Sequence, residues 1–476
     1  MSIFNNHLGL YTDFYELTMA QGYFYHKKEK KSATFDYFFR TNPFNGGFTV
    51  FAGLYDFLEL LAKFNYSKTD IEFLKNQGLK SEFLEYLKDF RFQGNIFSVN
   101  EGEIVFPNAP VLRVEGNIIE SQIIESLLLN FLNFESLIAT KAFRIKMVSG
   151  NKIFSDFGLR RAQGFGALHA SRAACIGGAA STSNVMAGKL YNLPVTGTQA
   201  HSWIQSFDNE LQAFRAFAEV NQDNTILLVD TFETLKSGVP NAIIVAKELE
   251  KKGKKLKAIR LDSGDLAYFS KKARKLLDDA GLKYVKIIAS NQLNEFVVKS
   301  LLHDQRAPID AFGIGTELIT GKSDAALDGV YKLAEIDGLP KMKFSENIEK
   351  VTLPGKKKLI RFFDENGYFY RDGIICEDEI PENVHTLYHP VYPEKNSIIQ
   401  DLKYQVLLQK VMDNGRIIIK NKSPLAIHNY LKERIQLLPS EHQRFISPHI
   451  YKVGISKKLM ETRNYLTKQL KVQDSA

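Results

Sequence analysis

The sequence predicts an α/β fold, and three observations support this prediction. The chain has 476 residues, 44% hydrophobic and 24% charged, so it can bury a large core. Between Asp156 and Gly315, short apolar segments that end in a polar residue or a glycine alternate with helical stretches. Steps of 32, 29 and 24 residues separate Asp230, Asp262, Asn291 and Gly315, which end four of these segments. A helix between successive strands implies parallel pairing, because an antiparallel hairpin needs no crossover.

A barrel is favoured over a doubly wound sheet in this middle region. A dinucleotide-binding sheet should open on Gly-x-Gly-x-x-Gly, but Gly164-Phe165-Gly166 is followed by Ala167-Leu168-His169. The expected strands are residues 153–158, 193–198, 225–230, 256–262, 284–291 and 310–316. The expected helices between them include residues 210–220, 241–252, 265–280 and 292–302. In a barrel of this kind, the chemistry is expected at the carboxyl ends of the strands.

The flanking regions predict a mixed α+β module. We expect a capped helix over residues 12–25, strands over 33–40 and 48–54, a helix over 81–90 and a small antiparallel sheet over 96–119. Residues 338–363 predict short strands with basic turns, and a C-terminal helix over 457–470 is expected to pack back on the N-terminal module. The predicted domains are therefore an α+β module (1–140), an α/β barrel (141–336) and a C-terminal extension that completes the N-terminal module (337–476).

Composition argues against several classes of protein. The longest apolar stretch, residues 123–139, is interrupted by Glu125, Asn130, Asn133 and Glu135, so no membrane helix of ~18 apolar residues is expected. The N-terminal residues lack the features of a secretory signal, and Cys175 and Cys376 are the only cysteines. We therefore expect a cytoplasmic protein without a structural zinc site.

The net charge of +8 and the pI near 9.0 raise the question of a nucleic-acid partner. The basic runs, residues 27–31, 251–257 and 356–358, are short and dispersed. A phosphate-rich substrate explains the excess positive charge at least as well, so neither nucleic acid nor a membrane is expected as a partner.

Residues that can do chemistry follow each expected strand. They are Asp156, His201, Asp230, the group Arg260, Asp262 and Asp265, the pair Ser290 and Asn291, and the pair Gly313 and Gly315. An aspartate such as Asp230 is also a common helix N-cap, so that role stays open. Arg260 on a buried strand needs an anionic partner, and the nearby Asp262 and Asp265 offer carboxylates suited to ribose hydroxyls or a divalent cation.

Two further features indicate phosphate chemistry. Residues 312–332 place glycines after a strand, followed by hydroxyls and lysines, and backbone N–H groups at such a turn can bind a phosphate. His201 lies near the end of an expected strand, where it would act either as a general base or as a nucleophile phosphorylated by ATP.

These segments together resemble the nicotinate phosphoribosyltransferase family. The resemblance is carried by residues 11–24, 35–54, 154–207, 227–243, 260–266, 287–295, 312–336 and 448–456, in the family's order and across nearly the whole chain. It implies a type II phosphoribosyltransferase: an irregular α/β barrel with a mixed N-terminal module, working as a homodimer with sites at the subunit interface. The implied reaction, part of NAD biosynthesis and salvage, joins nicotinate to phosphoribosyl pyrophosphate to give nicotinate mononucleotide, with ATP hydrolysis and Mg²⁺.

The resemblance also implies a role for individual residues. His201 would be phosphorylated by ATP, with Asp230 as the carboxylate near it. Phe157 and the partner subunit's Tyr15 would stack on the pyridine ring, and Arg160 or Arg161 would hold the nicotinate carboxylate or the phosphates of the sugar. The remaining expected contacts are Arg260 and Asp262 for ribose and pyrophosphate, Gly315, Thr316 and Lys332 for the 5′-phosphate, and Ser183 beside the base. Ser290 and Asn291 are expected to bind substrate, with no part of it assigned to them, and no metal-ligand set within the protein is assigned.

The related nicotinamide phosphoribosyltransferases are the nearest alternative. They place an aspartate near the base, whereas this chain has Ser181-Thr182-Ser183-Asn184 at the corresponding stretch, which favours a base with a carboxylate. An aldolase or isomerase barrel would require a lysine or paired acids at a strand end, and no expected strand ends in lysine. An RNA-binding protein would require exposed aromatics among basic residues, but most aromatics here have the spacing of a core.

Overall fold

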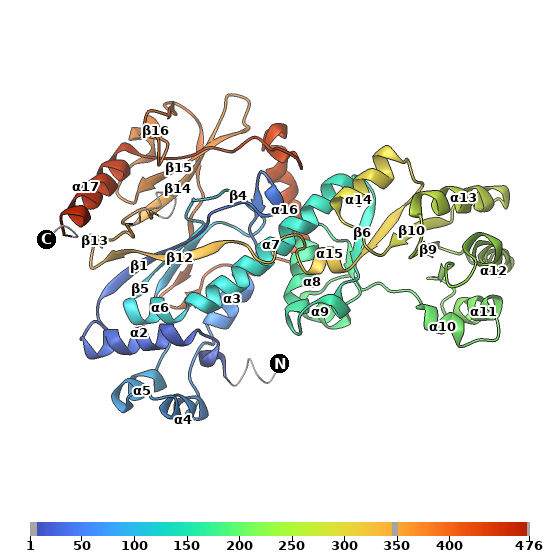
Figure 1. The fold of residues 1–476 in the computed structure, drawn as a ribbon, viewed down its shortest axis with the longest axis horizontal. Coiled ribbons are helices and arrows are strands. Elements are labelled where there is room, and N and C mark those ends of the chain that lie inside the picture. Colours follow the sequence, from blue (N-terminus) through green and yellow to red (C-terminus); the bar gives the residue numbers. More distant parts are fainter. Residues whose placement is uncertain (1–6, 345–350, 474–476) are drawn as a thin grey trace. The chain divides into compact units, whose positions relative to one another are not determined.

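The computed structural model describes residues 7–344 and 351–473, and the chain forms two compact units (Figure 1). The larger unit contains residues 1–137, 326–422 and 429–476, and the smaller unit contains residues 138–325 and 423–428. Part of the expected 338–363 strand region, residues 345–350, lies outside the described residues. In the described ranges, no helix combines the length and the apolar character that crossing a membrane requires.

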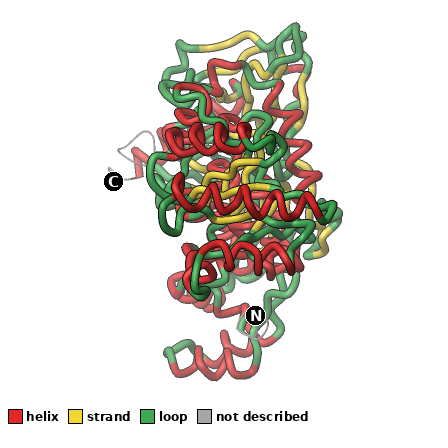
Figure 2. The backbone as a smooth tube through the Cα atoms, turned by 90° about the vertical axis from the view of Figure 1, so that its right-hand side faces the viewer, coloured by secondary structure: helices red, strands yellow, loops and turns green. Residues whose placement is uncertain are grey.

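The smaller unit is built on a parallel sheet of six strands in the order β7-β6-β11-β10-β9-β8. The strands are β6 (Ile153–Asp156), β7 (Ser181–Thr182), β8 (Ile226–Leu228), β9 (Ala258–Leu261), β10 (Lys286–Ser290) and β11 (Ala311–Ile314). The connecting helices are α8 (Gly166–Ile176), α9 (Val185–Tyr191), α10 (His201–Gln205), α11 (Glu210–Val220), α12 (Val239–Lys251), α13 (Leu266–Asp279), α14 (Glu295–Lys299) and α15 (Thr316–Ile319). Helices alternate with these strands along the chain, and all the strand pairings are parallel, which confirms the predicted α/β class and parallel sheet. Figure 2 shows the helices and strands of the chain in red and yellow.

The sheet is open rather than closed in the described residues. Its edge strands are β7 and β8, and no pairing joins them. The α/β arrangement is therefore established, whereas closure into a barrel is not.

One expected strand is absent. Residues 193–198 form only an isolated parallel bridge, between Val195 and Thr182. Pro194 cannot donate a ladder hydrogen bond, and its carbonyl instead accepts from the N–H of Thr182. The edge position belongs to β7, a two-residue strand that the apolar pattern did not indicate.

Local sequence explains where several of these helices begin. The side chains of Asn184, Asn209, Asp265 and Asn294 accept backbone N–H groups at the starts of α9, α11, α13 and α14. The apolar faces of α11, α12 and α13 bury one cluster with β8, β9 and β10, including Phe214, Val245, Leu277 and Ile287. The strand ends are thus held by a packed layer of helices.

The larger unit contains two larger sheets. The first has seven strands in the order β13-β12-β1-β5-β3-β19-β20, and the second has six in the order β17-β16-β21-β15-β14-β18. Their strands are β1 (Ser32–Phe39), β3 (Asn95–Ser98), β5 (Leu112–Asn117), β12 (Gly329–Ile336), β13 (Leu339–Pro340), β14 (Lys357–Phe363), β15 (Phe369–Cys376), β16 (Thr386–Tyr388), β17 (Asn396–Ile398), β18 (Tyr404–Val406), β19 (Gln409–Asp413), β20 (Arg416–Ile417) and β21 (Val453–Ile455); β2 (Thr49–Val50) and β4 (Ile104–Val105) form a separate pair. The expected antiparallel pairing within residues 96–119 is confirmed by β3 and β5.

The helices of this unit include α2 (Phe14–Tyr25), α3 (Leu54–Leu61), α4 (Lys68–Asn76), α5 (Ser81–Lys88), α6 (Ile118–Ile123) and α17 (Lys457–Gln473). Two further helices, α7 (Glu125–Ser149) and α16 (Pro424–Gln436), contain the boundaries between the units. Helices α2, α5 and α17 confirm the helices expected over residues 12–25, 81–90 and 457–470.

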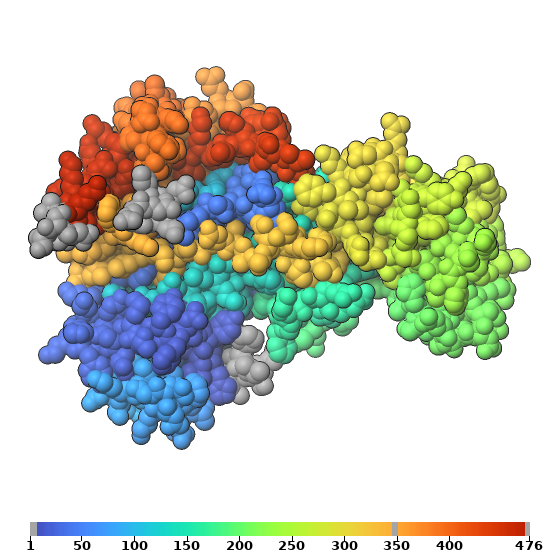
Figure 3. All heavy atoms as spheres, viewed as in Figure 1, coloured from blue at the N-terminus to red at the C-terminus, as the bar shows by residue number. Residues whose placement is uncertain are grey.

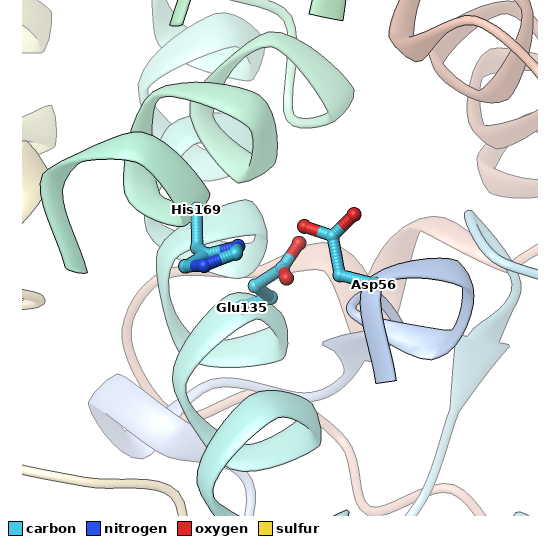
Figure 4. A group of neighbouring side chains, drawn as sticks. All are labelled: Asp56, Glu135 and His169. Carbon is cyan, nitrogen blue, oxygen red and sulfur yellow. The ribbon is translucent and has the colours of Figure 1, made fainter. Parts of the chain in front are cut away.

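Helices α3 and α7 approach each other closely in this unit. Gly53 precedes α3 with a φ of +94°, and a Cβ at this position would lie 2.7 Å from the carbonyl oxygen of Phe131. Two buried carboxylates belong to these helices, Asp56 on α3 and Glu135 on α7, and both are labelled in Figure 4. The figure also labels His169, which is on α8 of the smaller unit.

A buried ionic network joins N-terminal and C-terminal segments of the larger unit. Arg361 on β14 binds Asp372 on β15 at 2.8 Å and Glu103 at 2.7 Å, and all three side chains are at most 1% exposed. Arg434 of α16 donates to the same oxygen of Glu103 at 2.9 Å. The space-filling view shows orange and red C-terminal segments beside blue N-terminal ones in this unit (Figure 3).

Candidate active site

Polar side chains line up along the carboxyl edge of the six-stranded parallel sheet. The strand order places Ser183 after β7, Phe157 after β6, Gly315 after β11, Asn291 after β10 and Asp262 after β9, with Asp230 beyond the outer strand β8. The pairing register places the carboxyl ends of β6, β11 and β10 side by side, because Ile314 pairs with Asp156 and Gly313 pairs with Ser290. These predicted site residues therefore share one edge of one sheet.

Asp156 supports the turn that carries Phe157. Its carboxylate accepts hydrogen bonds from Ser171 Oγ and Thr182 Oγ1, each at 2.7 Å, and from the N–H of Gly158 at 2.7 Å. Burial raises the pKa of this carboxyl. Because all these contacts are internal, Asp156 acts here as a structural residue.

The ring of Phe157 lies against Gly313. A Cβ at Gly313 would lie 2.5 Å from both Cδ2 and Cε2 of the ring, which is far inside van der Waals contact. The N–H of Phe157 donates to the carbonyl oxygen of Ile314 at 2.8 Å. Glycine at 313 is thus required to seat the aromatic ring, a reason that sequence analysis, which considered only phosphate access, had missed.

Asp230 and Asp262, both predicted from the sequence as site residues, are linked. Asp230 Oδ2 accepts from the N–H of Asp262 at 2.6 Å and from Ser263 Oγ at 2.8 Å, while its buried Oδ1 has no hydrogen-bond partner among the described residues. Asp262 Oδ1 accepts from Ser290 Oγ at 2.5 Å. Asp265 instead caps α13, accepting the N–H of Tyr268 at 2.9 Å. The interpretation of Asp230 as a simple helix N-cap is wrong, because its carboxylate binds the neighbouring strand end.

Arg260 is a largely buried cation at this edge. Its Nη1 donates to Thr198 Oγ1, and its buried Nε has no hydrogen-bond partner in the described residues. Desolvation lowers the pKa of the guanidinium, nearby Asp262 and Asp230 raise it, and Arg160 lowers it. No ion pair forms between Arg260 and Asp262 or Asp265 in the described part of the chain, contrary to the expectation from sequence. An anionic ligand would meet an arginine that is already desolvated.

His201 begins α10, just after the segment that contains Thr198. Its Nδ1 lies 3.1 Å from Thr231 Oγ1, and Thr231 directly follows Asp230. The side chain is half-buried. This contact holds one ring nitrogen and leaves Nε2 as the nitrogen available to a substrate.

The remaining predicted residues of the smaller unit differ in exposure. Arg160, Asn291 and Thr316 are exposed, whereas Ser290 is buried and Ser183 is partly buried. Asn291 has a φ of +77°, a conformation that asparagine tolerates better than most residues. Thr316 starts the four-residue helix α15.

Tyr15 and Lys332 belong to the larger unit, whereas the strand ends of the site belong to the smaller unit. Tyr15 on α2 is 46% exposed, and burial followed by the charge of Glu125 raises its pKa. Lys332 on β12 pairs with Asp36 of β1 in the sheet register, and its charge lowers the pKa of Glu125, although burial raises that pKa overall. Tyr15 and Lys332 thus share Glu125 as an electrostatic neighbour, which no sequence motif had indicated.

Comparison with known proteins identifies the family. Residues 10–133 match the model of the nicotinate phosphoribosyltransferase (NAPRTase) N-terminal domain, and residues 356–463 match that of the C-terminal domain. A nicotinate phosphoribosyltransferase of Bacillus subtilis is 42% identical over 461 residues, covering 94% of this chain and 93% of that protein. This chain belongs to the nicotinate phosphoribosyltransferase family.

A more distant relative and two solved structures are also similar to this chain. The Caenorhabditis elegans protein of that name is 37% identical over 95% of this chain and 92% of its own length. The crystal structure of human nicotinic acid phosphoribosyltransferase superimposes with a TM-score of 0.86 at 28% identity, covering 96% of this chain and 99% of that one. The structure of a Pyrococcus furiosus protein described as nicotinate-nucleotide pyrophosphorylase matches with a TM-score of 0.70 at 26% identity, covering 91% and 96% of the two chains.

Proposed function

We propose that this protein transfers the phosphoribosyl group of phosphoribosyl pyrophosphate to nicotinate, giving nicotinate mononucleotide and pyrophosphate in NAD biosynthesis and salvage, with ATP hydrolysis coupled to turnover. The observation that carries the proposal is the row along one sheet edge in which a seated aromatic, Phe157, accompanies the desolvated cation Arg260 and the acid Asp262. Family membership supports the same assignment.

The sugar and its phosphates fit the middle of the row. Arg260 supplies a guanidinium to which no carboxylate of the described residues is bound, and Asp262, held by Ser290, offers an oxygen for ribose hydroxyls. Gly315 and Thr316 follow β11, the neighbour of β10, at the position we assign to the 5′-phosphate. Transfer through an oxocarbenium-like state needs positioning of both reactants and stabilisation of the departing pyrophosphate, and Arg260 can provide the second.

The base fits the end of the row near β6 and β7. Phe157 would stack on the pyridine ring, and the exposed Arg160 or Arg161 would pair with an anionic group of the substrates. The neighbouring stretch contains Ser183 but no acid, and the oxygens of the nearby Asp156 accept internal hydrogen bonds. This arrangement favours nicotinate over nicotinamide, because a free carboxylate here would repel the nicotinate carboxylate.

The far end of the row fits Mg²⁺ and ATP. The Oδ1 of Asp230, which has no hydrogen-bond partner in the described ranges, and the carboxylate of Asp262 are oxygen donors of the type Mg²⁺ prefers. The bound ion would supply positive charge to phosphate oxygens. His201 would attack the γ-phosphorus of ATP through Nε2, releasing ADP, while Thr231 holds Nδ1.

We further infer a homodimer in which the partner subunit's Tyr15 completes the aromatic stack. Tyr15 is exposed near the start of α2, and Lys332 is the cation of the same unit that shares Glu125 with it. Size measurement in solution tests the dimer. A mixture of Tyr15→Ala and Arg260→Gln chains tests the shared site, because only such hybrids would contain one intact site and regain activity.

The phosphorylation of His201 has its own test. Incubation with γ-labelled ATP is expected to give acid-labile label on the wild-type protein and none on His201→Ala. Thr231→Val, which removes only the contact to Nδ1, should keep the label but slow its formation. Label that survives in His201→Ala would end this assignment.

A further inference from the structure

The larger unit contains a deep cleft that the proposed reaction does not explain. Its volume is about 1850 Å³, and it is lined by residues of both larger sheets and of α17. The described lining residues include eight lysines or arginines but only two aspartates. One of these acids, Asp36, is already paired with Lys357 at 2.7 Å. The cleft is therefore strongly cationic, and Lys332 accounts for only one of its charges.

Arg371 on β15 is the most informative of these cations. It is 7% exposed, and its Nε has no hydrogen-bond partner within the described residues. Burial lowers its pKa, and the groups that oppose this effect are the phenols Tyr370 and Tyr451 rather than a carboxylate. Arg361 on the adjacent strand β14 is buried too, but it binds both Glu103 and Asp372. A buried guanidinium without an anion is costly, so Arg371 is suited to a ligand that brings negative charge.

Arg463 on α17 is a second cation without an acidic partner in the described chain. Its Nη1 donates to the carbonyl oxygen of Pro390, and burial lowers its pKa with no carboxylate opposing that effect. The adjacent His389 accepts the N–H groups of Val391 and Tyr392 on Nδ1 at 3.0 and 3.1 Å. Because Nδ1 is an acceptor, the proton of the neutral ring is on Nε2, which makes this nitrogen a donor.

Two exposed lysines, Lys395 and Lys452, line the cleft beside these residues. The carbonyl oxygen of Lys452 accepts the N–H of Asp372, which places Lys452 beside Arg371 in the sheet. Lys395 lies 4.8 Å from the ring centroid of Tyr392, in the turn between β16 and β17 that contains His389. Donors from β15, the β16–β17 turn, the approach to β21 and α17 thus face one cleft.

We propose that this wall, formed by Arg371, His389, Lys395, Lys452 and Arg463, is a second anion site that binds the di- or triphosphate group of a phosphorylated metabolite. Several separated cations match a chain of phosphates better than a single carboxylate, and arginine pairs with phosphate in a bidentate manner. The ligand would tie α17 to β15 and to the β16–β17 turn. All five residues belong to the C-terminal part of the larger unit, and none of them is assigned to the proposed reaction.

Calorimetric titration of the full-length protein with inorganic tripolyphosphate, without Mg²⁺, tests this proposal. The background variant is Arg260→Gln/Lys332→Ala, which removes one assigned phosphate contact from each unit. We expect this background to keep one binding event that weakens with added salt. Adding Lys395→Ala and Lys452→Ala should weaken that event by roughly ten- to a hundredfold, since charge-assisted contacts to phosphate are lost. Adding Arg371→Gln should abolish it.

A matched control removes two exposed lysines elsewhere, Lys271 and Lys272 on α13, by substitution with alanine. It should change the affinity by less than threefold, because only the diffuse charge is altered. If Arg371→Gln does not fold, the variant with Lys395→Ala and Lys452→Ala still tests the proposal, since both side chains are exposed and their removal should not affect folding. The proposal is overturned if the background variant binds no tripolyphosphate, or if the Lys395/Lys452 pair behaves like the control.

Discussion

Substitution of Gly313 by alanine should damage the binding of the base specifically. Gly313 does not have a positive φ, so its backbone accepts alanine, but the new Cβ would lie 2.5 Å from two atoms of the Phe157 ring. Ordinary contact is about 3.5–4.0 Å, so the ring must move by roughly 1 Å. We expect the overpacking to cost about 1–3 kcal/mol of unfolding free energy. Loss of aromatic stacking should raise the KM for nicotinate by about 2- to 10-fold, with a smaller change in the KM for phosphoribosyl pyrophosphate.

Steady-state kinetics and thermal unfolding measure these effects. Gly22→Ala is the matched control, because Gly22 lies in helix α2 with no atom within 4 Å of its Cβ position, and alanine there should be neutral or slightly stabilising. In a Phe157→Leu background, Gly313→Ala should cost much less, since the clash is with the ring. A Gly313→Ala protein with unchanged stability and unchanged nicotinate KM would refute the reasoning.

Three further predictions follow from the contacts. Arg361→Met leaves Glu103 and Asp372 buried without their shared cation and should lower the unfolding free energy by about 3–5 kcal/mol. The control Arg215→Met, which breaks an exposed pair with Glu248, should barely change the melting temperature. Equal losses of stability in the two variants would contradict the network's role. Asp265→Ala removes the cap of α13 and should lower the unfolding free energy by about 1 kcal/mol while kcat is retained. Asp262→Asn should instead lower kcat while the unfolding free energy is retained. Burial raises the pKa of Glu16 from 4.5 to about 7, so its contribution to stability is complete below pH 4.5 and is lost as the pH rises through 7. Thermal unfolding should show the wild type losing stability relative to Glu16→Gln between pH 5 and pH 8. A difference in stability that stays constant with pH would contradict this prediction.

Periodicity in the sequence was sufficient for most of the middle region. Five of the six expected strands are present, because a buried parallel strand must be a short apolar run and its crossover helix must be amphipathic. The sixth was misplaced: Pro194 has no N–H to donate to a ladder, so residues 193–198 make only an isolated bridge, and the edge is formed by the polar pair Ser181–Thr182. Closure of the sheet could not be judged from the sequence, because it depends on edge pairing that no local pattern encodes.

The candidate site shows the same division. Strand ends located Arg260 and Asp262 along one edge, because parallel strands bring their carboxyl ends together, whereas Phe157 was implied by the family resemblance. The partners of these residues were not predictable, since they depend on tertiary contacts. Arg260 donates to Thr198 rather than to a nearby aspartate, and Asp262 is held by Ser290 on the neighbouring strand.

The most direct test of the central claim is product formation by the purified protein from phosphoribosyl pyrophosphate and one pyridine base, with and without ATP. Nicotinate mononucleotide and pyrophosphate should appear in equal amounts, faster with ATP, and nicotinamide should give far less product. No mononucleotide from nicotinate, or a preference for nicotinamide, would contradict the account.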